Sequence, residues 1–432
     1  MMNSEADSRV VEQTLNVSIE KLVYGGEGLA RTEQGVLLVP GVLPGESVEV
    51  ELQPRQHGVR RGRLVRLVEP CQERVPPDCP YFAQCGGCQY QFIRYEEQLR
   101  LKQEILRECC ERVGKFRLNV PVSVLADEPW HYRNRTRLRI ENQSGRFEIG
   151  YFEPSSHRLC AIERCPISSP AINQVLKSLC DGVGASCFPE GKAEIELFAS
   201  DSDQAILATV SSSLAPPRDF GEKLRSALTG VESVSWRQEP SGKKMVWGSG
   251  SITYHVGEFH YRVGHDSFFQ VNRFLPDQMI RSVIADIEGA RALDLYAGVG
   301  LFTVPLARRF QRVTAVEAQA AAARDLASNV GVAGARVRSY HRAVEKFIAN
   351  TSPSWELILV NPPRNGLSKI VVEHLRRLHP RRFVYVSCDP TTLARDLAAL
   401  IHSGYQIRSV HLVDQFPQTF HLESVIHLEH AG

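Results

Sequence analysis

The sequence predicts an α/β protein whose C-terminal part is a doubly wound, mostly parallel sheet. Three observations predict it. Short apolar runs alternate with helical segments through residues 261–432, residues 11–69 hold only short strand-like runs between glycine and proline turns, and residues 70–260 mix helical and strand patterns around a group of cysteines. A chain of 432 residues is long enough for the three domains that these patterns suggest.

The first of these parts is expected to fold as a small β-barrel. Its strand-like runs cover 17–22, 35–39, 47–52 and 62–68, and the turn signals between them are Gly25-Gly26-Glu27-Gly28, Pro40-Gly41, Pro44-Gly45 and His57-Gly58. Near its end lie five clustered arginines, Arg55, Arg60, Arg61, Arg63 and Arg66. A charge run is usually a solvated face, but clustered arginines on a small barrel favour RNA binding.

The middle part combines a helix over 96–112 with strands near 132–140, 146–152, 193–200 and 204–210. Four arginines alternate along the first of these strands, at Arg133, Arg135, Arg137 and Arg139. In a strand all four guanidinium groups would project from one face. Because such a row is costly to bury unpaired, it either meets water and carboxylates or lines a track for RNA phosphates, and we favour the track.

A cysteine cluster in the middle part indicates a metal site. Cys79, Cys85 and Cys88 form a C-x5-C-x2-C pattern on a glycine-rich turn, and the total of eleven cysteines is odd. Without a signal peptide this argues for metal or catalytic use and against disulfides. A fourth ligand must come from elsewhere, and Cys71 and Cys160 are candidates. Four thiolates suit zinc or a [4Fe–4S] cluster, and the spacing does not choose between them. Packing roles are expected for Cys109, Cys110, Cys180 and Cys187.

The C-terminal part predicts a nucleoside site at the carboxyl edge of its sheet, where ligands bind in such folds. Strands are expected at 291–296, 312–317, 335–338, 356–360 and 382–387, with a final hairpin over 405–429. The first strand leads into Gly298 and Gly300, and the second ends at Glu317, which can accept hydrogen bonds from ribose hydroxyls. Position 303 is Thr, so the dinucleotide fingerprint is incomplete and S-adenosylmethionine is favoured over NAD.

A thiol lies at the same predicted edge. Cys388 follows the strand 382–387, and Asn361 ends the preceding strand in an Asn-Pro-Pro-Arg turn. A thiol beside a methyl donor suggests methylation of an unactivated carbon such as C5 of a pyrimidine. Thiolate addition at C6 makes C5 nucleophilic, and a base must then remove the C5 proton. Glu423, at the start of the last strand, is the candidate base, although alone it would be read as a surface glutamate.

These features together resemble the RNA uracil-5-methyltransferases. The family signatures are a D-x-x-x-G-x-G-like loop, an (Asp/Asn)-Pro-Pro-Arg turn, a Ser-Cys-(Asp/Asn)-Pro motif and a late His-x-Glu, and all four occur here in that order. The resemblance covers essentially the whole chain. It implies an OB-like TRAM barrel that binds RNA at 11–69, a central α+β iron–sulfur and RNA-binding domain at 70–260, and a Rossmann-like class I methyltransferase domain at 261–432.

The resemblance also implies roles for single residues. It makes Cys388 the nucleophile and Glu423 the base. With the two glycines of the loop, it implies an S-adenosylmethionine site of Gln270, Tyr296, Gly298, Gly300, Glu317 and Asn361. It favours a [4Fe–4S] cluster on Cys79, Cys85 and Cys88, with Cys165 as the fourth ligand. The implied substrate is uracil in RNA, 23S rRNA first and tRNA as the alternative. Many members have Asp where this chain has Asn361, but a carboxamide can still pair with uracil N3–H and O4.

Two other classes remain as alternatives. An amino-group methyltransferase would carry an aromatic residue after Asn-Pro-Pro, where this chain has Arg364, and a non-catalytic iron–sulfur RNA-binding protein would leave Cys388 and Glu423 without a role. The net charge of +2 neither requires nor excludes nucleic acid. The start of the chain lacks a signal peptide and no apolar run reaches the length of a membrane span, so we expect a cytoplasmic monomer with no membrane partner.

Overall fold

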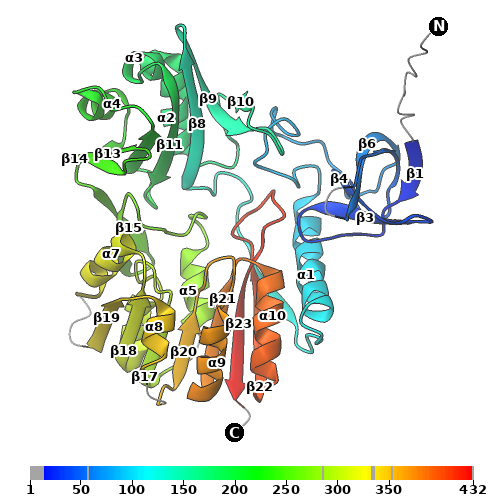
Figure 1. The fold of residues 1–432 in the computed structure, drawn as a ribbon, viewed down its shortest axis with the longest axis vertical. Coiled ribbons are helices and arrows are strands. Elements are labelled where there is room, and N and C mark those ends of the chain that lie inside the picture. Colours follow the sequence, from blue (N-terminus) through cyan, green and yellow to red (C-terminus); the bar gives the residue numbers. More distant parts are fainter. Residues whose placement is uncertain (1–13, 56–57, 285–286, 332–335, 352–353, 431–432) are drawn as a thin grey trace, which may run out of the picture.

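The computed structural model describes residues 14–55, 58–284, 287–331, 336–351 and 354–430. In Figure 1 the chain forms an N-terminal barrel at one side, a central sheet above, and a larger α/β layer structure below. Small portions of the predicted elements, at 11–13, His57, 335 and 431–432, lie outside the described residues.

The N-terminal part is a six-stranded, curled sheet in the order β1-β5-β6-β4-β3-β2. Its strands are β1 (Thr14–Ser18), β2 (Lys21–Leu22), β3 (Glu27–Thr32), β4 (Gly35–Pro40), β5 (Ser47–Leu52) and β6 (Arg60–Glu69). The sequence did not predict β3, because Gly28 was read as part of a turn. Gly28 instead serves close packing inside the strand, since a Cβ there would lie 2.4 Å from Val42 Cγ2.

The middle part is built on a seven-stranded sheet in the order β10-β9-β8-β11-β12-β13-β14, in which only β12 and β13 pair in parallel. Helices α2 and α4 pack on one face over a buried apolar cluster, which leaves the other face to polar residues. This agrees with the predicted α+β class. The elements from residue 95 to 248 are α1 (Tyr95–Arg112), β7 (Val122–Leu125), β8 (Arg135–Gln143), β9 (Arg146–Phe152), β10 (Leu159–Ala161), α2 (Pro170–Ser178), a π-helical turn (Leu179–Val183), α3 (Gly184–Cys187), β11 (Gly191–Ala199), β12 (Ile206–Ser212), α4 (Phe220–Ala227), β13 (Val231–Gln238) and β14 (Lys243–Gly248).

The predicted strand at 132–140 is wrong at its start. Strand β8 begins at Arg135, and Arg133 makes only isolated bridges to Ser168 and Asn272. The backbone N–H of Arg133 donates to the Ile167 carbonyl at 2.8 Å. Arg133 therefore pairs with the segments before helices α2 and α5, and it does not pair with strand β11. Three of the four arginines therefore share a strand face, and the fourth does not.

The C-terminal part is an eight-stranded sheet in the order β19-β18-β17-β20-β21-β23-β22-β7, preceded by the hairpin β15–β16. All neighbours are parallel except those of β23. The elements are β15 (Ser251–Val256), β16 (Phe259–Gly264), α5 (Pro276–Ile284), β17 (Gly289–Leu295), α6 (Thr303–Arg309), β18 (Phe310–Glu317), α7 (Ala320–Gly331), β19 (Val337–His341), α8 (Val344–Ile348), β20 (Leu357–Val360), α9 (Lys369–Leu378), β21 (Arg382–Ser387), α10 (Pro390–Ile401), β22 (Tyr405–Val413) and β23 (Glu423–His430).

This sheet is buried on both faces, which explains its continuous apolar strands. Leu293 and Leu295 pack with α1, α8, α9 and α10, whereas Ala292 of the same strand packs with α5, α6 and the β15–β16 hairpin. The predicted doubly wound sheet with an antiparallel edge is therefore confirmed. No helix in the described part of the chain is both long and apolar enough to cross a membrane.

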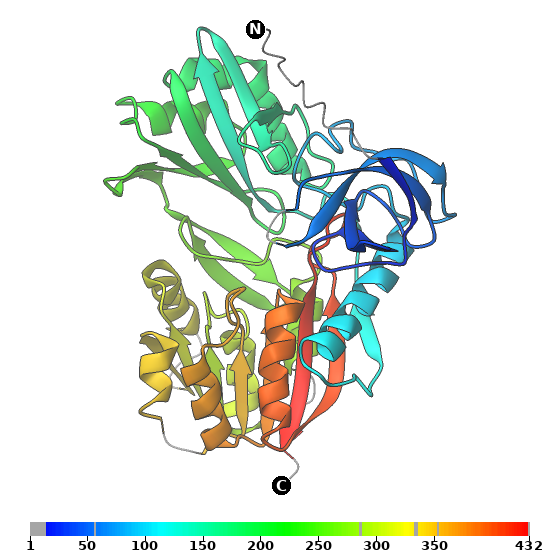
Figure 2. The same cartoon turned by 45° about the vertical axis from the view of Figure 1, so that its right-hand side comes forward.

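Two elements from the middle of the chain join this C-terminal layer. Strand β7 pairs in parallel with β22, and α1 shares the apolar cluster of α10. In Figure 2, α1 lies along the α/β part beside α10 and below the barrel. We retain the division at 11–69, 70–260 and 261–432 as a proposal, with the observation that residues 95–125 pack on the third part.

Candidate active site and nucleic-acid interface

Three predicted cofactor residues meet at the carboxyl edge of the C-terminal sheet. Strand β17 pairs with β18 and β20 so that Leu295 lies opposite Val316 on one side and Val360 on the other. The next residue of each strand is Tyr296, Glu317 and Asn361 respectively. They follow adjacent parallel strands at the same level, so the sheet register brings these three positions together.

The glycine loop is held against Glu317. The Gly298 N–H donates to Glu317 Oε2 at 2.8 Å, and Gln319 N–H donates to Oε1 at 2.6 Å. Gly298 and Gly300 both have positive φ, and so does Tyr296 at +61°, which is rare for a bulky residue. A carboxylate has about four acceptor positions, so two remain on Glu317 for the ribose hydroxyls of a nucleoside.

Two buried residues lie close to this loop. Asp294 accepts a hydrogen bond from Thr303 Oγ1 at 2.5 Å, which ties the end of strand β17 to the start of α6. Burial raises the pKa of Asp294 to about 7. Gln270 is also buried, in the chain between β16 and α5. Its contact with the nucleoside remains a prediction.

The predicted nucleophile and base face each other across two strands. Strands β21 and β23 pair antiparallel with Ser387 opposite Ser424, so the next residues in register are Cys388 and Glu423. Glu423 is only 5% exposed, and burial raises its pKa to about 7. Burial also raises the pKa of the Cys388 thiol to about 11; the charge of Glu423 adds to this rise, and that of Arg364 opposes it. The two groups therefore lie side by side at the carboxyl edge of β21, and we refer to this place as the crevice.

Asp389, directly after the thiol, caps helix α10. Its Oδ1 accepts hydrogen bonds from the backbone N–H groups of Thr391 and Thr392, each at 2.9 Å. The cap fixes the turn that carries Cys388 at the amino end of a helix. That end bears a partial positive charge, which favours the thiolate over the thiol.

Two further residues of this crevice were not predicted as functional. The positive charge of Arg364 partly offsets the rise in the pKa of Cys388, and it adds to the effect of burial in lowering the pKa of His421. His421 lies between the rings of Phe416 and Phe420, with centroids at 5.6 and 4.2 Å. Burial lowers its pKa to about 4, so the imidazole is neutral at physiological pH. Arg364 belongs to the Asn-Pro-Pro-Arg motif and His421 to the His-x-Glu motif. These motifs are the sequence signal from which a role for both residues could have been predicted.

The four predicted cluster ligands line one cavity of about 220 Å³. They are Cys79, Cys85, Cys88 and Cys165. Burial raises the pKa of Cys85 to about 12 and that of Cys88 to about 11, as expected for thiols held away from water. The competing candidates, Cys71 and Cys160, are outside this lining, although Cys71 lines an adjoining cavity that Cys85 and Cys88 also line.

Within the described residues, no three Cys, His, Asp or Glu side chains are set to hold a single metal ion. The other cysteines mostly follow the prediction. Cys109, Cys110 and Cys187 are buried, but Cys180 is exposed on the π-helical turn and is not a packing residue.

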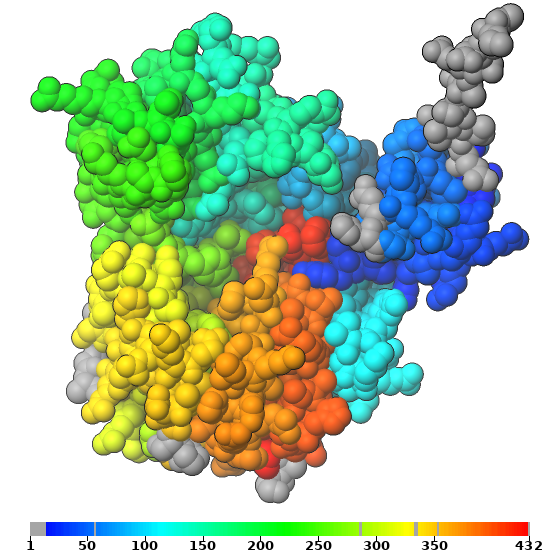
Figure 3. Space-filling model, viewed as in Figure 1, coloured from blue at the N-terminus to red at the C-terminus, as the bar shows by residue number. Residues whose placement is uncertain are grey.

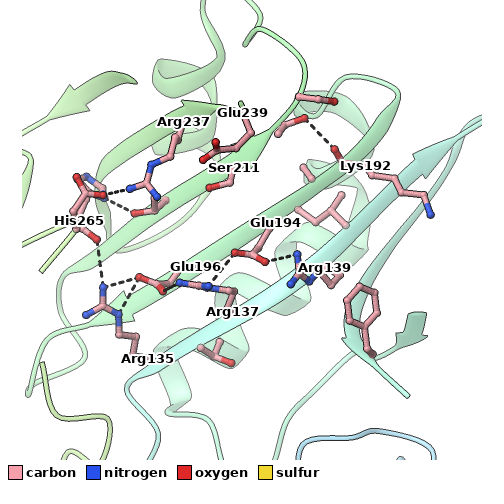
Figure 4. A pocket seen from close by; sticks show the side chains of 18 of the residues that line it. Arg135, Arg137, Arg139, Lys192, Glu194, Glu196, Ser211, Arg237, Glu239 and His265 are labelled. Carbon is pink, nitrogen blue, oxygen red and sulfur yellow. Dashed lines mark hydrogen bonds and ion pairs between the residues drawn. The ribbon is translucent and has the colours of Figure 1, made fainter. Parts of the chain in front are cut away.

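The arginine row of β8 lies in a groove of about 990 Å³ on the open face of the central sheet (Figure 4). Arg135 pairs with Glu196 at 2.6 Å, Arg137 with Glu194 at 3.1 Å, and Arg139 also pairs with Glu194. The row thus meets carboxylates of β11. Arg135 is the least exposed of the three and also donates to the Ser267 carbonyl at 2.6 Å, so it ties the sheet to the C-terminal part.

The groove extends to the cofactor edge of the C-terminal sheet. Figure 3 shows a recess between the upper and lower lobes, with the red loop between β22 and β23 visible inside it and the blue barrel beside it. The groove lining includes Phe268, which is 61% exposed, and Gln319, which is next to the cofactor edge.

Family models decide the class to which this site belongs. The model of the tRNA (Uracil-5-)-methyltransferase family matches residues 94–431, and the model of the TRAM domain matches residues 9–65. The chain belongs to the RNA uracil-5-methyltransferase family. It is an S-adenosylmethionine-dependent RNA (uracil-5-)-methyltransferase with an N-terminal TRAM domain, as the resemblance of its motifs implied.

Relatives of this methyltransferase match over nearly the full chain. A 23S rRNA (uracil(1939)-C(5))-methyltransferase RlmD from Pectobacterium atrosepticum is 32% identical over 96% of this chain and 94% of its own. That of Alkalilimnicola ehrlichii is 31% identical over 96% and 97%. An uncharacterized RNA methyltransferase of Halalkalibacterium halodurans is 30% identical over 96% of both chains.

One solved structure supports the fold of this methyltransferase. It is the Pyrococcus abyssi tRNA (uracil-54, C5)-methyltransferase in complex with S-adenosyl-L-homocysteine. The TM-score is 0.77 at 24% identity, over 96% of this chain and 100% of that one. The class I methyltransferase fold predicted from the sequence is thereby confirmed.

Proposed function

We propose that this enzyme methylates C5 of a uridine in 23S rRNA through a covalent adduct with Cys388. The observation that carries the mechanism is the register that sets Cys388 opposite Glu423, beside the edge formed by Tyr296, Glu317 and Asn361. The choice of 23S rRNA rests on the two RlmD relatives. We retain from the sequence a cytoplasmic location and a monomeric state as further proposals.

The proposed reaction conserves electrons and protons at each step. The Cys388 thiol gives its proton to water, a loss favoured by the Arg364 charge and the amino end of α10, and the thiolate sulfur bonds to C6 of uracil. Bound S-adenosylmethionine supplies an electrophilic methyl group. C5 attacks that methyl carbon, so the carbon–sulfur bond breaks and S-adenosylhomocysteine leaves. Glu423 then takes the C5 proton, the C5–C6 double bond re-forms, and the Cys388 thiolate is expelled.

The substrate proposal is tested by mapping 5-methyluridine in a strain that lacks this gene. Loss of one 5-methyluridine from 23S rRNA, restored by the wild-type gene, is the expected result. Loss from tRNA instead would establish the second candidate, which the name of the family model favours. RNA that contains 5-fluorouridine should form a stable adduct with the wild-type enzyme, because fluorine at C5 cannot leave as a proton. Neither an amino-group methyltransferase nor a non-catalytic protein would form this adduct.

We also propose that the four-cysteine cavity holds a [4Fe–4S] cluster. Four thiols that line one cavity are the ligand set of such a cluster, and the resemblance to the family favours it over zinc. Arg133 lies in the lining of this cavity, and its Nε is buried with no hydrogen-bond partner among the described residues. A cluster on four thiolates is negatively charged, so it would compensate the buried guanidinium. Methyl transfer needs no electrons, and the cluster would be structural.

Anaerobically purified enzyme should therefore be brown, with broad visible absorption and equal amounts of iron and sulfide. Cys165→Ser should lose most of this absorption, since it removes one of four ligands. Cys71→Ser is the matched control, because Cys71 is outside the lining of the four-cysteine cavity, and it should keep the full spectrum. One zinc and no iron per chain under these conditions would contradict the proposal.

The barrel and the groove are the proposed RNA surfaces. In both, arginines are paired with carboxylates, such as Arg61 with Glu27 at 2.6 Å and Arg66 with Glu49 at 3.1 Å in the barrel. Exposed pairs of this kind contribute only about 0–1 kcal/mol, so RNA phosphates can replace the carboxylates. The arginine row of β8 then binds the RNA backbone, while the crevice selects the base.

Changing Arg137 and Arg139 together to Gln should weaken RNA binding and flatten its salt dependence. Each lost phosphate contact should lower the slope of log affinity against log salt by roughly 0.7–0.9. Methyl transfer at saturating RNA should change much less. Arg146→Gln is the control, since Arg146 is an exposed, ion-paired residue of β9 outside the groove lining. An unchanged slope in the double variant would show that the row is only a solvated face.

A further inference from the structure

The loop between β22 and β23 leads directly to the proposed base. It covers residues 414–422 and rises from the C-terminal sheet toward the central part of the molecule (Figure 1). Glu423 is the first residue of β23. It pairs with Val413 of β22, but the pairing of β23 with β21 begins only at Ser424. Among the described strands the backbone of Glu423 is therefore paired on one side only, and strand ends held in this way open most easily.

The 414–422 loop is buried although it has no regular secondary structure. Asp414, Gln415, Gln418 and Thr419 are each at most 3% exposed. A buried irregular segment needs hydrogen-bond partners within the protein, because water does not reach its polar groups. Several of these partners come from helix α1, in the middle part of the chain.

A fully buried ion pair joins α1 to the start of the loop. Lys102 Nζ lies 2.6 Å from Asp414 Oδ1, and neither side chain has any exposed surface. The same ammonium donates to the Phe416 carbonyl at 3.0 Å, and the Tyr95 hydroxyl donates to Asp414 Oδ2 at 2.8 Å. Burial lowers the pKa of Lys102, and the charge of Asp414 opposes that change. One helix therefore supplies a donor to each oxygen of this carboxylate.

A reciprocal pair of amides joins the same helix to the tip of the loop. Gln98 Nε2 donates to Gln418 Oε1 at 2.9 Å, and the Gln418 backbone N–H donates to Gln98 Oε1 at 3.0 Å. Gln418 has a φ of +67°, which is uncommon for a residue with a side chain, so these contacts fix a particular turn. Because residues three or four apart share a helix face, Tyr95, Gln98 and Lys102 form one polar stripe on α1.

Stability alone does not explain this polar stripe. A buried ion pair contributes little net stability, because the cost of desolvation offsets the attraction, and apolar residues of similar volume often serve the fold as well. A buried polar network whose members are satisfied instead specifies one geometry. Here that geometry is imposed on the loop that ends at Glu423.

We propose that the polar stripe of α1 positions the base, because it holds the 414–422 loop so that Glu423 stays beside Cys388. The proposal rests on the covalent function proposed above. It gives α1 a part in the last chemical step, since Glu423 acts only after the methyl group has been transferred. Misplacement of a reacting group by about 1 Å can lower the rate of its step by about 100-fold.

The double variant Lys102→Met with Asp414→Asn tests the proposal, since it removes both charges and leaves no buried ion without a partner. On ordinary uridine, loss of the methylated protein–RNA adduct should slow by about 10- to 100-fold, so this adduct should accumulate. Formation of the adduct on 5-fluorouridine RNA should stay within about twofold of the wild-type rate, because that reaction stops before the base acts. The measurements are single-turnover time courses with a labelled methyl group, followed by denaturing electrophoresis.

Tyr95→Phe tests the same point with the ion pair intact, since it removes one hydroxyl and keeps the ring. It should slow adduct loss by roughly 3- to 10-fold, because only one of the contacts to Asp414 is removed. Tyr405→Phe is the matched control. It removes a buried hydroxyl that donates to the Pro380 carbonyl at 2.9 Å, at the opposite end of β22 from the loop. This control should lose some thermal stability and keep the wild-type rate of adduct loss.

Two outcomes would overturn the inference. A wild-type rate of adduct loss in Tyr95→Phe would show that the polar stripe does not act on the base. Equal slowing of adduct formation and adduct loss would show that the stripe only supports the fold. If the wild-type enzyme forms no adduct on 5-fluorouridine RNA, the covalent function fails first. If it forms that adduct and the variants lose the methylated adduct at the wild-type rate, the inference alone fails.

Discussion

Cys388→Ala is expected to abolish RNA methylation while S-adenosylmethionine still binds with nearly the wild-type affinity. The thiol supplies the bond to C6 without which C5 does not become nucleophilic, so its loss should lower the rate on the order of 10⁴-fold or more. Binding of the methyl donor should persist, because its proposed contacts lie on the ends of β17, β18 and β20, and Cys388 follows β21. The measurements are single-turnover methylation of RNA and calorimetric binding of S-adenosylmethionine.

The matched control is Cys180→Ala, which removes an exposed thiol from the central part. It should keep full activity, and it should still be trapped on 5-fluorouridine RNA. Cys388→Ala should show no trapped species at any RNA concentration. Substantial turnover by Cys388→Ala would sink the covalent mechanism and return the amino-group alternative to consideration.

Glu423→Gln is expected to add to C6 and transfer the methyl group, and then to stall as a stable protein–RNA adduct on ordinary uridine. A carboxamide has nearly the shape of the carboxylate but cannot accept the C5 proton, so elimination of Cys388 is blocked. The adduct should carry the transferred methyl group and survive denaturing electrophoresis. Glu429→Gln, on the same strand but paired with Arg408 at 3.1 Å, should behave as wild type. A normal rate with no adduct in Glu423→Gln would place the base elsewhere.

The raised pKa of Glu423 adds a pH test. Because burial raises its pKa to about 7, the carboxylate that accepts the proton is fully formed only above that pH, and wild-type product release should rise with pH through about 7. Stability should change in the opposite direction. A folded-state pKa above the ordinary value stabilises the fold at low pH, and this contribution is lost as the pH rises through about 7. The free energy of unfolding of Glu423→Gln should therefore exceed that of the wild type by up to about 3 kcal/mol at pH 8. Near pH 4 the two free energies of unfolding should be nearly equal.

Several strands, and the positions that follow them, were predictable because their signals are local. The strands at 47–52, 146–152 and 382–387 were predicted with the observed bounds, since each is a short run bounded by turn residues. Residues at or directly after the ends of strands, such as Glu317 and Asn361, are placed by those strands. Once the sheet is known to be parallel, their meeting at one edge follows.

The sequence by itself determined the class of fold and the family, because strand periodicity and short motifs depend on neighbours along the chain. The residues for nucleophile, base and cofactor contacts are predictions that rest on the same motifs. Tertiary structure alone decided that Glu194 and Glu196 pair with the arginine row, that Arg133 lines the cysteine cavity, and that Tyr24 of the barrel packs on Phe420. These contacts join segments far apart in sequence. They depend on register between strands and on how separate apolar cores pack, and no local pattern encodes either.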